Sequence, residues 1–195
     1  TEVARGAFDV GSFQEEAARC VRDHPELIQI RWADDDLVVR AIAADPLAMK
    51  PPAVSSTAPE SADAARRATR SGEPTHTGLF RSNDGRFVIE LYEPIPHGRA
   101  AAGTVCGTYS CGQLLRQAVP RHVVDSNRVS LVGEGGQVVC SLRNDAEVDR
   151  TLAGDVPLAV FGGTVAVRLE RHATGVFGPQ MWLLTLLCVG LTLGM

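Results

Sequence analysis

The C-terminal residues 173–195 contain no Asp, Glu, Lys or Arg, and they end in the apolar run 181–195. A helix needs about 20 largely apolar residues to cross the hydrocarbon core of a bilayer, and this segment is long enough if most of it is used. Trp182 lies where an interfacial aromatic side chain is expected, and Arg171 and His172 mark the polar edge. The sequence therefore predicts a transmembrane helix over 173–195, truncated at the end of this chain.

The alternative for this segment is a buried helix of a globular core, because glycines and threonines interrupt the apolar run. Residues 1–172 are polar enough to be soluble. We therefore expect an inner-membrane protein whose residues 1–172 lie in the periplasm or another extracytoplasmic space.

The charge and the motifs exclude several classes of function. The net charge of −4 and the single lysine, Lys50, exclude a protein that follows nucleic-acid phosphates. The histidines are scattered, and HExxH, GxSxG, Walker A and GxGxxG segments are all missing, so the sequence predicts no catalytic residue, metal site or cofactor. The cysteines show no CxxC spacing. Outside the predicted span we expect buried free thiols, although the compartment would permit a disulfide.

The first part of the chain predicts a helix, a hairpin, a loop, a short helix, a meander of three strands and a closing helix. Helix periodicity, β-branched runs and turn residues give the limits of these elements. The expected ranges are helix 12–24 with a capping box at 12–15, strands 27–33 and 37–42 around an acidic turn, loop 45–60, helix 61–71 capped by Ser61, strands 75–81, 87–92 and 103–110, and helix 111–119.

The second part repeats this plan in miniature. Strands are expected at 128–132 and 137–141 around a glycine turn, and at 156–161 and 164–171 around Gly162-Gly163. The predicted fold class is therefore α+β, with two antiparallel sheets in tandem. A single mixed β domain is the alternative.

Three segments carry a resemblance to a known family. They are HPELIQIRW at 24–32, GRFVIELYEPI at 85–95, and AGTVCGTYS at 102–110 followed by two leucines. The order of elements and these segments resemble the double Cache, PAS-like ectodomains of bacterial sensor histidine kinases. The resemblance implies four parts, which are an N-terminal helix at 1–26, a membrane-distal sensor module at 27–120, a smaller membrane-proximal module at 121–172 and the span at 173–195.

The resemblance also implies a function. The chain is expected to be the ligand-sensing region of a two-component histidine kinase that forms a homodimer, with the kinase outside this chain and no enzyme within it. Ligand binding would shift a population of conformations, and the strand 164–171 would carry the change into the span. The alternatives are an input domain of a chemoreceptor or a diguanylate cyclase, a membrane-anchored enzyme or assembly factor, and a structural domain without a ligand.

The candidate ligand site lies between the sheet of the distal module and its cover at 43–76. Alternation along the strand 87–92 places Val88, Glu90 and Tyr92 on one face of the sheet. The predicted order of helices and strands brings several polar side chains near this face, and an arginine among them favours a small anionic ligand. For each of them a solvated or structural role is the alternative. The candidate ligand-binding residues are Arg31, Arg67, His76, Tyr92 and Thr108.

Overall fold

The computed structural model describes residues 10–44, 59–95, 103–143, 148–158 and 165–172. The first part of the chain contains α1 (Val10–Asp23), β1 (Leu27–Ala33), β2 (Val39–Ala44), α2 (Pro59–Ser71), β3 (Thr75–His76), β4 (Phe80–Arg81), β5 (Phe87–Ile95), β6 (Gly103–Ser110) and α3 (Cys111–Ala118). The second part contains α4 (Arg121–Ser126), β7 (Asn127–Val132), the short 3-10 turn η1 (Glu134–Gly136), β8 (Val138–Leu142), β9 (Val148–Pro157) and β10 (Ala166–His172).

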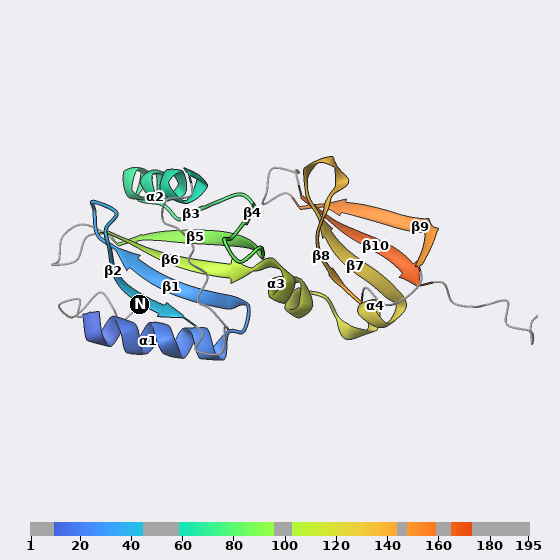
Figure 1. Ribbon diagram of the computed structural model, residues 1–195, viewed down its shortest axis with the longest axis horizontal. Helices are drawn as coiled ribbons and strands as arrows, with labels where there is room; N and C mark the ends of the chain where they lie inside the picture. Colours follow the sequence, from blue (N-terminus) through green and yellow to red (C-terminus); the bar gives the residue numbers. More distant parts are fainter. Residues whose placement is uncertain (1–9, 45–58, 96–102, 144–147, 159–164, 173–195) are drawn as a thin grey trace, which may run out of the picture.

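The first sheet has the strand order β2-β1-β6-β5-β3, and β4 also pairs with β5. All its pairs are antiparallel, so β1 joins the first hairpin to the last strand of the meander. Helices cover both faces, with α1 on one side and α2 on the other (Figure 1). Neighbouring residues of a strand point to opposite faces, so Trp32 packs near Phe13 of α1. Arg31 consequently points to the face that α2 covers.

The second sheet has the order β8-β7-β10-β9, again with antiparallel pairs. In both sheets the first strand of a hairpin lies between its hairpin partner and the last strand of the sheet. The prediction of an α+β fold with two antiparallel sheets of like design is therefore confirmed.

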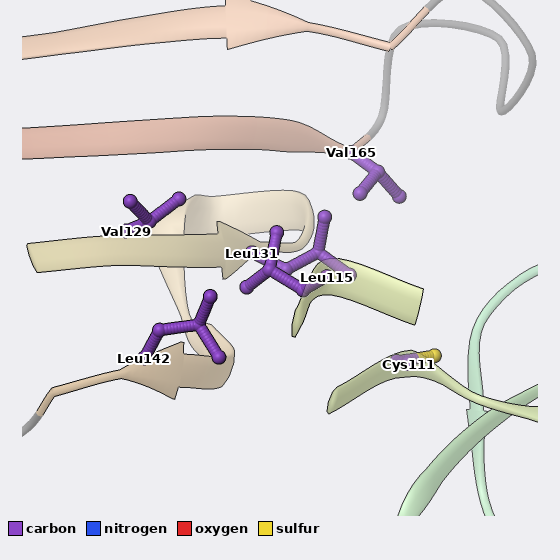
Figure 2. Packing of buried hydrophobic residues seen from close by; sticks show 6 residues of the cluster. All are labelled: Cys111, Leu115, Val129, Leu131, Leu142 and Val165. Carbon is purple, nitrogen blue, oxygen red and sulfur yellow. The ribbon is translucent and has the colours of Figure 1, made fainter. Parts of the chain in front are cut away.

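An apolar cluster joins the two sheets around α3, which lies between them (Figure 1). Its buried members are Cys111, Leu115, Val129, Leu131, Leu142 and Val165. Figure 2 shows Leu115 of α3 beside Leu131 of β7, with Leu142 of β8 below them. Leu79 and Phe87 of the first part also pack against this cluster, so α3 is held from both sides.

Several predicted limits are wrong in the N-terminal part. The helix α1 begins at Val10, so Ser12 lies inside it and is not a helix cap, and His24 is exposed beyond its end. The helix α2 begins at Pro59, because proline is well tolerated in a first helical turn, and Ser61 is therefore not its cap. The strand expected at 75–81 is two short strands, since the register against β5 is interrupted between His76, opposite Leu91, and Phe80, opposite Val88.

The second part differs at two elements. The helix α4 was not predicted, because it is short and lies between two regions of clearer pattern. The strand expected at 156–161 begins much earlier, since β9 covers Val148–Pro157 and pairs with β10 along most of its length. Most of the loop 45–60, the turn at Gly162-Gly163 and the C-terminal helix 173–195 lie outside the described residues. Among the helices that are described, none combines the length and the apolar character that a membrane crossing requires.

The start of β6 depends on Gly103. Its φ is +141°, and a Cβ atom there would lie 2.1 Å from the carbonyl oxygen of Ala33 at the end of β1. We expect Gly103→Ala to lower the free energy of unfolding by about 1–3 kcal/mol, because either the backbone of β1 or that of β6 must move. Urea denaturation measures this loss, and Gly78→Ala is the control, since a Cβ atom at Gly78 meets nothing within 4 Å. Equal stabilities for the two variants would contradict the prediction.

Candidate functional site

A buried ion pair lies between α2 and the first sheet. The Nη2 atom of Arg31 on β1 is 2.8 Å from the Oε1 atom of Glu90 on β5. Arg31 is 4% exposed and Glu90 is fully buried. Taking two charges out of water costs several kcal/mol for each ion, so such a pair persists only when hydrogen bonds satisfy its remaining atoms.

Three hydroxyl groups complete the coordination of the Glu90 carboxylate. Tyr92 and Ser61 donate to Oε2 at 2.7 and 2.6 Å, and Thr108 donates to Oε1 at 3.3 Å. The Tyr92 hydroxyl also accepts a hydrogen bond of 2.7 Å from Arg31. The Arg31 guanidinium and the Glu90 carboxylate therefore share the Tyr92 hydroxyl, and the cluster forms one closed network, which we call the Arg31–Glu90 network.

The strand register explains why these residues meet. Arg31 pairs with Cys106 on β6, and Cys106 pairs with Tyr92 on β5, so these side chains form one row across the sheet. Thr108 pairs with Glu90 in the next row on the same face. The alternation expected along β5 is present, since Val88, Glu90 and Tyr92 are all buried. Residues far apart in the sequence are therefore neighbours only because β1 pairs with β6.

Small side chains bring α2 close to this face. Ala64, Ala65 and Ala68 are buried against Tyr92 and Cys106. This cover keeps the site dry, and burial raises the pKa of the Tyr92 hydroxyl and raises that of the Cys106 thiol to about 12. Both groups are consequently neutral at neutral pH, so Tyr92 remains a hydrogen-bond donor to Glu90.

The five predicted site residues fall into two groups. Arg31, Tyr92 and Thr108 belong to the Arg31–Glu90 network. Arg67 and His76 lie at its rim, where the exposed Arg67 donates a hydrogen bond of 3.1 Å to the backbone oxygen of His76. The ring Nδ1 atom of His76 is 2.9 Å from the backbone oxygen of Thr77. The rim contact holds β3 to α2, outside the network.

The sequence reasoning did not select Glu90, Ser61 or Thr77 as site residues. The sequence pattern could have indicated Glu90, because this residue shares a face of the strand with Tyr92 and a buried arginine needs an opposite charge. The sequence predicts Ser61 as a helix cap, whereas its hydroxyl donates a hydrogen bond to Glu90. Thr77 is buried and accepts a hydrogen bond of 2.9 Å from the backbone N–H of Glu90, a contact that only the fold creates.

Two surface hollows among the described residues lie in other places. One lies on the second sheet beside Asp155 and Arg168, and the other lies between α3, α4 and β8. Within the described ranges, no three residues among His, Cys, Asp and Glu come together as metal ligands. Under α2 the protein's own charged and hydroxyl groups are buried and bonded to one another.

Solved structures share this fold, whereas no protein-family profile and no curated protein matches the sequence. The extracellular domain of a putative histidine kinase superposes with a TM-score of 0.55 and 10% identity, covering 84% of this chain and 75% of that one. A domain of a putative sensory box/GGDEF family protein from Vibrio parahaemolyticus gives 0.54 and 11%, covering 84% and 78%. The ligand-binding domain of the amino acid chemoreceptor PctC from Pseudomonas aeruginosa, in complex with GABA, gives 0.50 and 13%, covering 87% and 85%.

Proposed function

We propose that this chain, which has the fold of the extracellular Cache, PAS-like domains of chemoreceptors and histidine kinases, is the ligand-sensing region of a membrane receptor. The observation that carries the proposal is a pair of opposite charges buried between the first sheet and the helix that covers it. Residues 27–120 would form the membrane-distal module and residues 121–172 the membrane-proximal one. Residues 173–195 would be the span, with residues 1–172 outside the cytoplasm.

The ligand proposed for this site is a small molecule that carries both an acidic and a basic group. Arg31 would bind a carboxylate through its guanidinium, as the sequence predicts. Glu90 already neutralises Arg31, so an anion alone would leave Glu90 buried without a counter-charge. A zwitterion would supply an opposite charge to Arg31 and to Glu90 at the same time. GABA, which the Pseudomonas chemoreceptor domain binds, is a molecule of this kind.

The proposed signal is a competition between the internal ion pair and the ligand. A ligand that binds the opened pair better than the closed pair shifts the population toward the opened state. In the opened state, with Arg31 and Glu90 separated, α2 would move relative to β5 and β6. The C-terminal end of β6 leads directly into α3. The apolar cluster around Leu115 would carry this movement to β7 and, through its pairing, to β10.

The output of the receptor is part of the proposal. A histidine kinase beyond the span remains our first assignment, and a homodimer is the expected assembly. Chemoreceptor domains have the same fold, so a chemoreceptor output is equally consistent with it. A kinase assay of the complete receptor, with and without a ligand, would distinguish the two outputs.

A thermal-shift screen of the 195-residue chain against amino acids and organic acids tests the site. We expect a zwitterionic ligand at 100 times its dissociation constant to add about 2.7 kcal/mol of stability. The variant Tyr92→Phe should bind that ligand about 10- to 100-fold more weakly, because it lacks the hydroxyl that contacts both charged partners. Isothermal titration calorimetry measures the change.

Tyr109→Phe is the matched control, because this variant also removes one tyrosine hydroxyl. Tyr109 lies on the neighbouring strand β6 and does not belong to the Arg31–Glu90 network. Equal loss of affinity in the two variants would place the ligand elsewhere. A panel without any hit would favour a second candidate function, a structural module that needs no ligand. The mutual bonding of the buried groups under α2 is the observation that favours this second candidate.

A further inference from the structure

The groove between α3, α4 and β8 is a feature that the proposed function does not use. It has a volume of about 600 Å³ and lies between the α3–α4 connection and β8. Its lining includes Val124, Leu142 and Ser141, whose hydroxyl group is 2.7 Å from that of Ser130. Figure 1 shows α3 between the two parts of the chain and α4 in the second part, beside β7. A molecule bound here would contact both the connection and the second sheet.

Three arginines line this groove, Arg116 from α3, Arg121 from α4 and Arg143 at the end of β8. Within the described ranges, the guanidinium groups of Arg116 and Arg121 form no hydrogen bond or ion pair. Arg143 has a long, exposed contact of 3.7 Å with Asp125. The chain as a whole is acidic, with a net charge of −4, so a groove lined by three arginines, of which only Arg143 has an ion-pair contact among the described residues, differs from the overall charge.

The backbone of Arg143 supports the same interpretation. Its φ is +55°, in the left-handed region that side chains other than glycine, Asn and Asp seldom adopt. Residues held in such conformations cluster at sites where ligands bind. Here the conformation ends β8 at a residue whose side chain lines the groove.

We propose that this groove is a second binding site, which takes a small soluble anion with two or more negative charges. Its volume is within the range of about 300–1,000 Å³ that small-molecule sites have. Guanidinium groups bind carboxylate and phosphate oxygens in pairs of hydrogen bonds, and several arginines favour an anion with several such oxygens. Bound there, the anion would tie the α3–α4 connection to β8 and stiffen the junction between the sheets.

Inorganic pyrophosphate is the probe for this site, titrated into the 195-residue chain by calorimetry at constant ionic strength. We expect saturable binding at one site with a dissociation constant below about 1 mM. The double variant Arg116→Gln/Arg121→Gln should weaken binding by at least tenfold. The matched control is Arg22→Gln/Arg70→Gln, which removes two exposed arginines from the ends of α1 and α2 and gives the same net charge.

Each outcome decides for or against the proposal. Loss of binding in the groove variant with retention in the control supports it. Equal weakening in both variants shows general attraction to charge and overturns it, as does the lack of saturable binding. If the glutamine variant does not fold, Arg116→Lys/Arg121→Lys replaces it, and unchanged affinity there would also overturn the proposal. Tyr92→Phe should bind pyrophosphate normally, so failure here is separate from failure at the site under α2.

Discussion

Replacing Glu90 with alanine is expected to lower the free energy of unfolding by about 3–5 kcal/mol, the largest effect of any single change considered for this protein. The variant leaves the guanidinium of Arg31, 4% exposed, without its counter-charge. It also removes the acceptor of the hydroxyl groups of Ser61, Tyr92 and Thr108. Urea denaturation followed by circular dichroism measures the loss.

Two comparisons make this prediction specific to the buried pair. Glu93→Ala removes an exposed carboxylate from the same strand and should change stability by less than about 0.5 kcal/mol. The double variant Arg31→Met/Glu90→Met should lose less than the sum of its single variants, with a coupling of about 0.5–3 kcal/mol. A loss below about 1 kcal/mol for Glu90→Ala, or strict additivity, would show that water reaches the pair.

The second large effect is expected at the junction between the sheets. Leu115→Ala should cost about 2–5 kcal/mol, because it opens a cavity among Val129, Leu131 and Leu142. In Figure 2 the Leu115 side chain lies in the middle of this cluster. The loss should also increase hydrogen exchange in β7 and in the final turn of α3, since both depend on this contact.

Leu91→Ala is the control for this cavity, because Leu91 loses the same atoms from a position that is 42% exposed. Its effect should remain within about 0.5 kcal/mol. If the two leucine variants were equally stable, or if hydrogen exchange in β7 were unchanged, α3 would not be the mechanical link that the proposed signal requires.

The resemblance derived from the sequence is confirmed at the level of fold. The segments around Arg31, Tyr92 and Thr108 suggested a Cache, PAS-like sensor, and solved domains of chemoreceptors and histidine kinases share the fold of this chain. The β-branched runs and turn residues located most strands within a few residues, because these patterns depend on local chemistry. The predicted starts of α1 at Ser12, of α2 at Ser61 and of β9 are wrong, because the sequence pattern at each of these places is compatible with more than one starting residue.

The candidate site was predictable in its strands and incomplete in its residues. Alternation correctly placed Tyr92 on the face under the cover, and it placed Glu90 there too. It could not show that Arg31 meets both, because that contact needs β1 to pair with β6, where Arg31 lies opposite Cys106, about 75 positions further along the chain. The roles of Ser61 and Thr77 depend on the same long-range arrangement.

The sequence by itself determined the alternation of helices and strands, the two antiparallel sheets and the face on which each side chain lies. The reason is that the 3.6-residue period of a helix and the 2-residue period of a strand are local properties of the backbone. Only the tertiary structure decided which faces meet. It joined Arg31 to Glu90 under α2 and placed Arg116, Arg121 and Arg143 around one groove. The physical reason is that strand order and helix packing are fixed by burial of apolar surface across the whole chain, which no local pattern encodes.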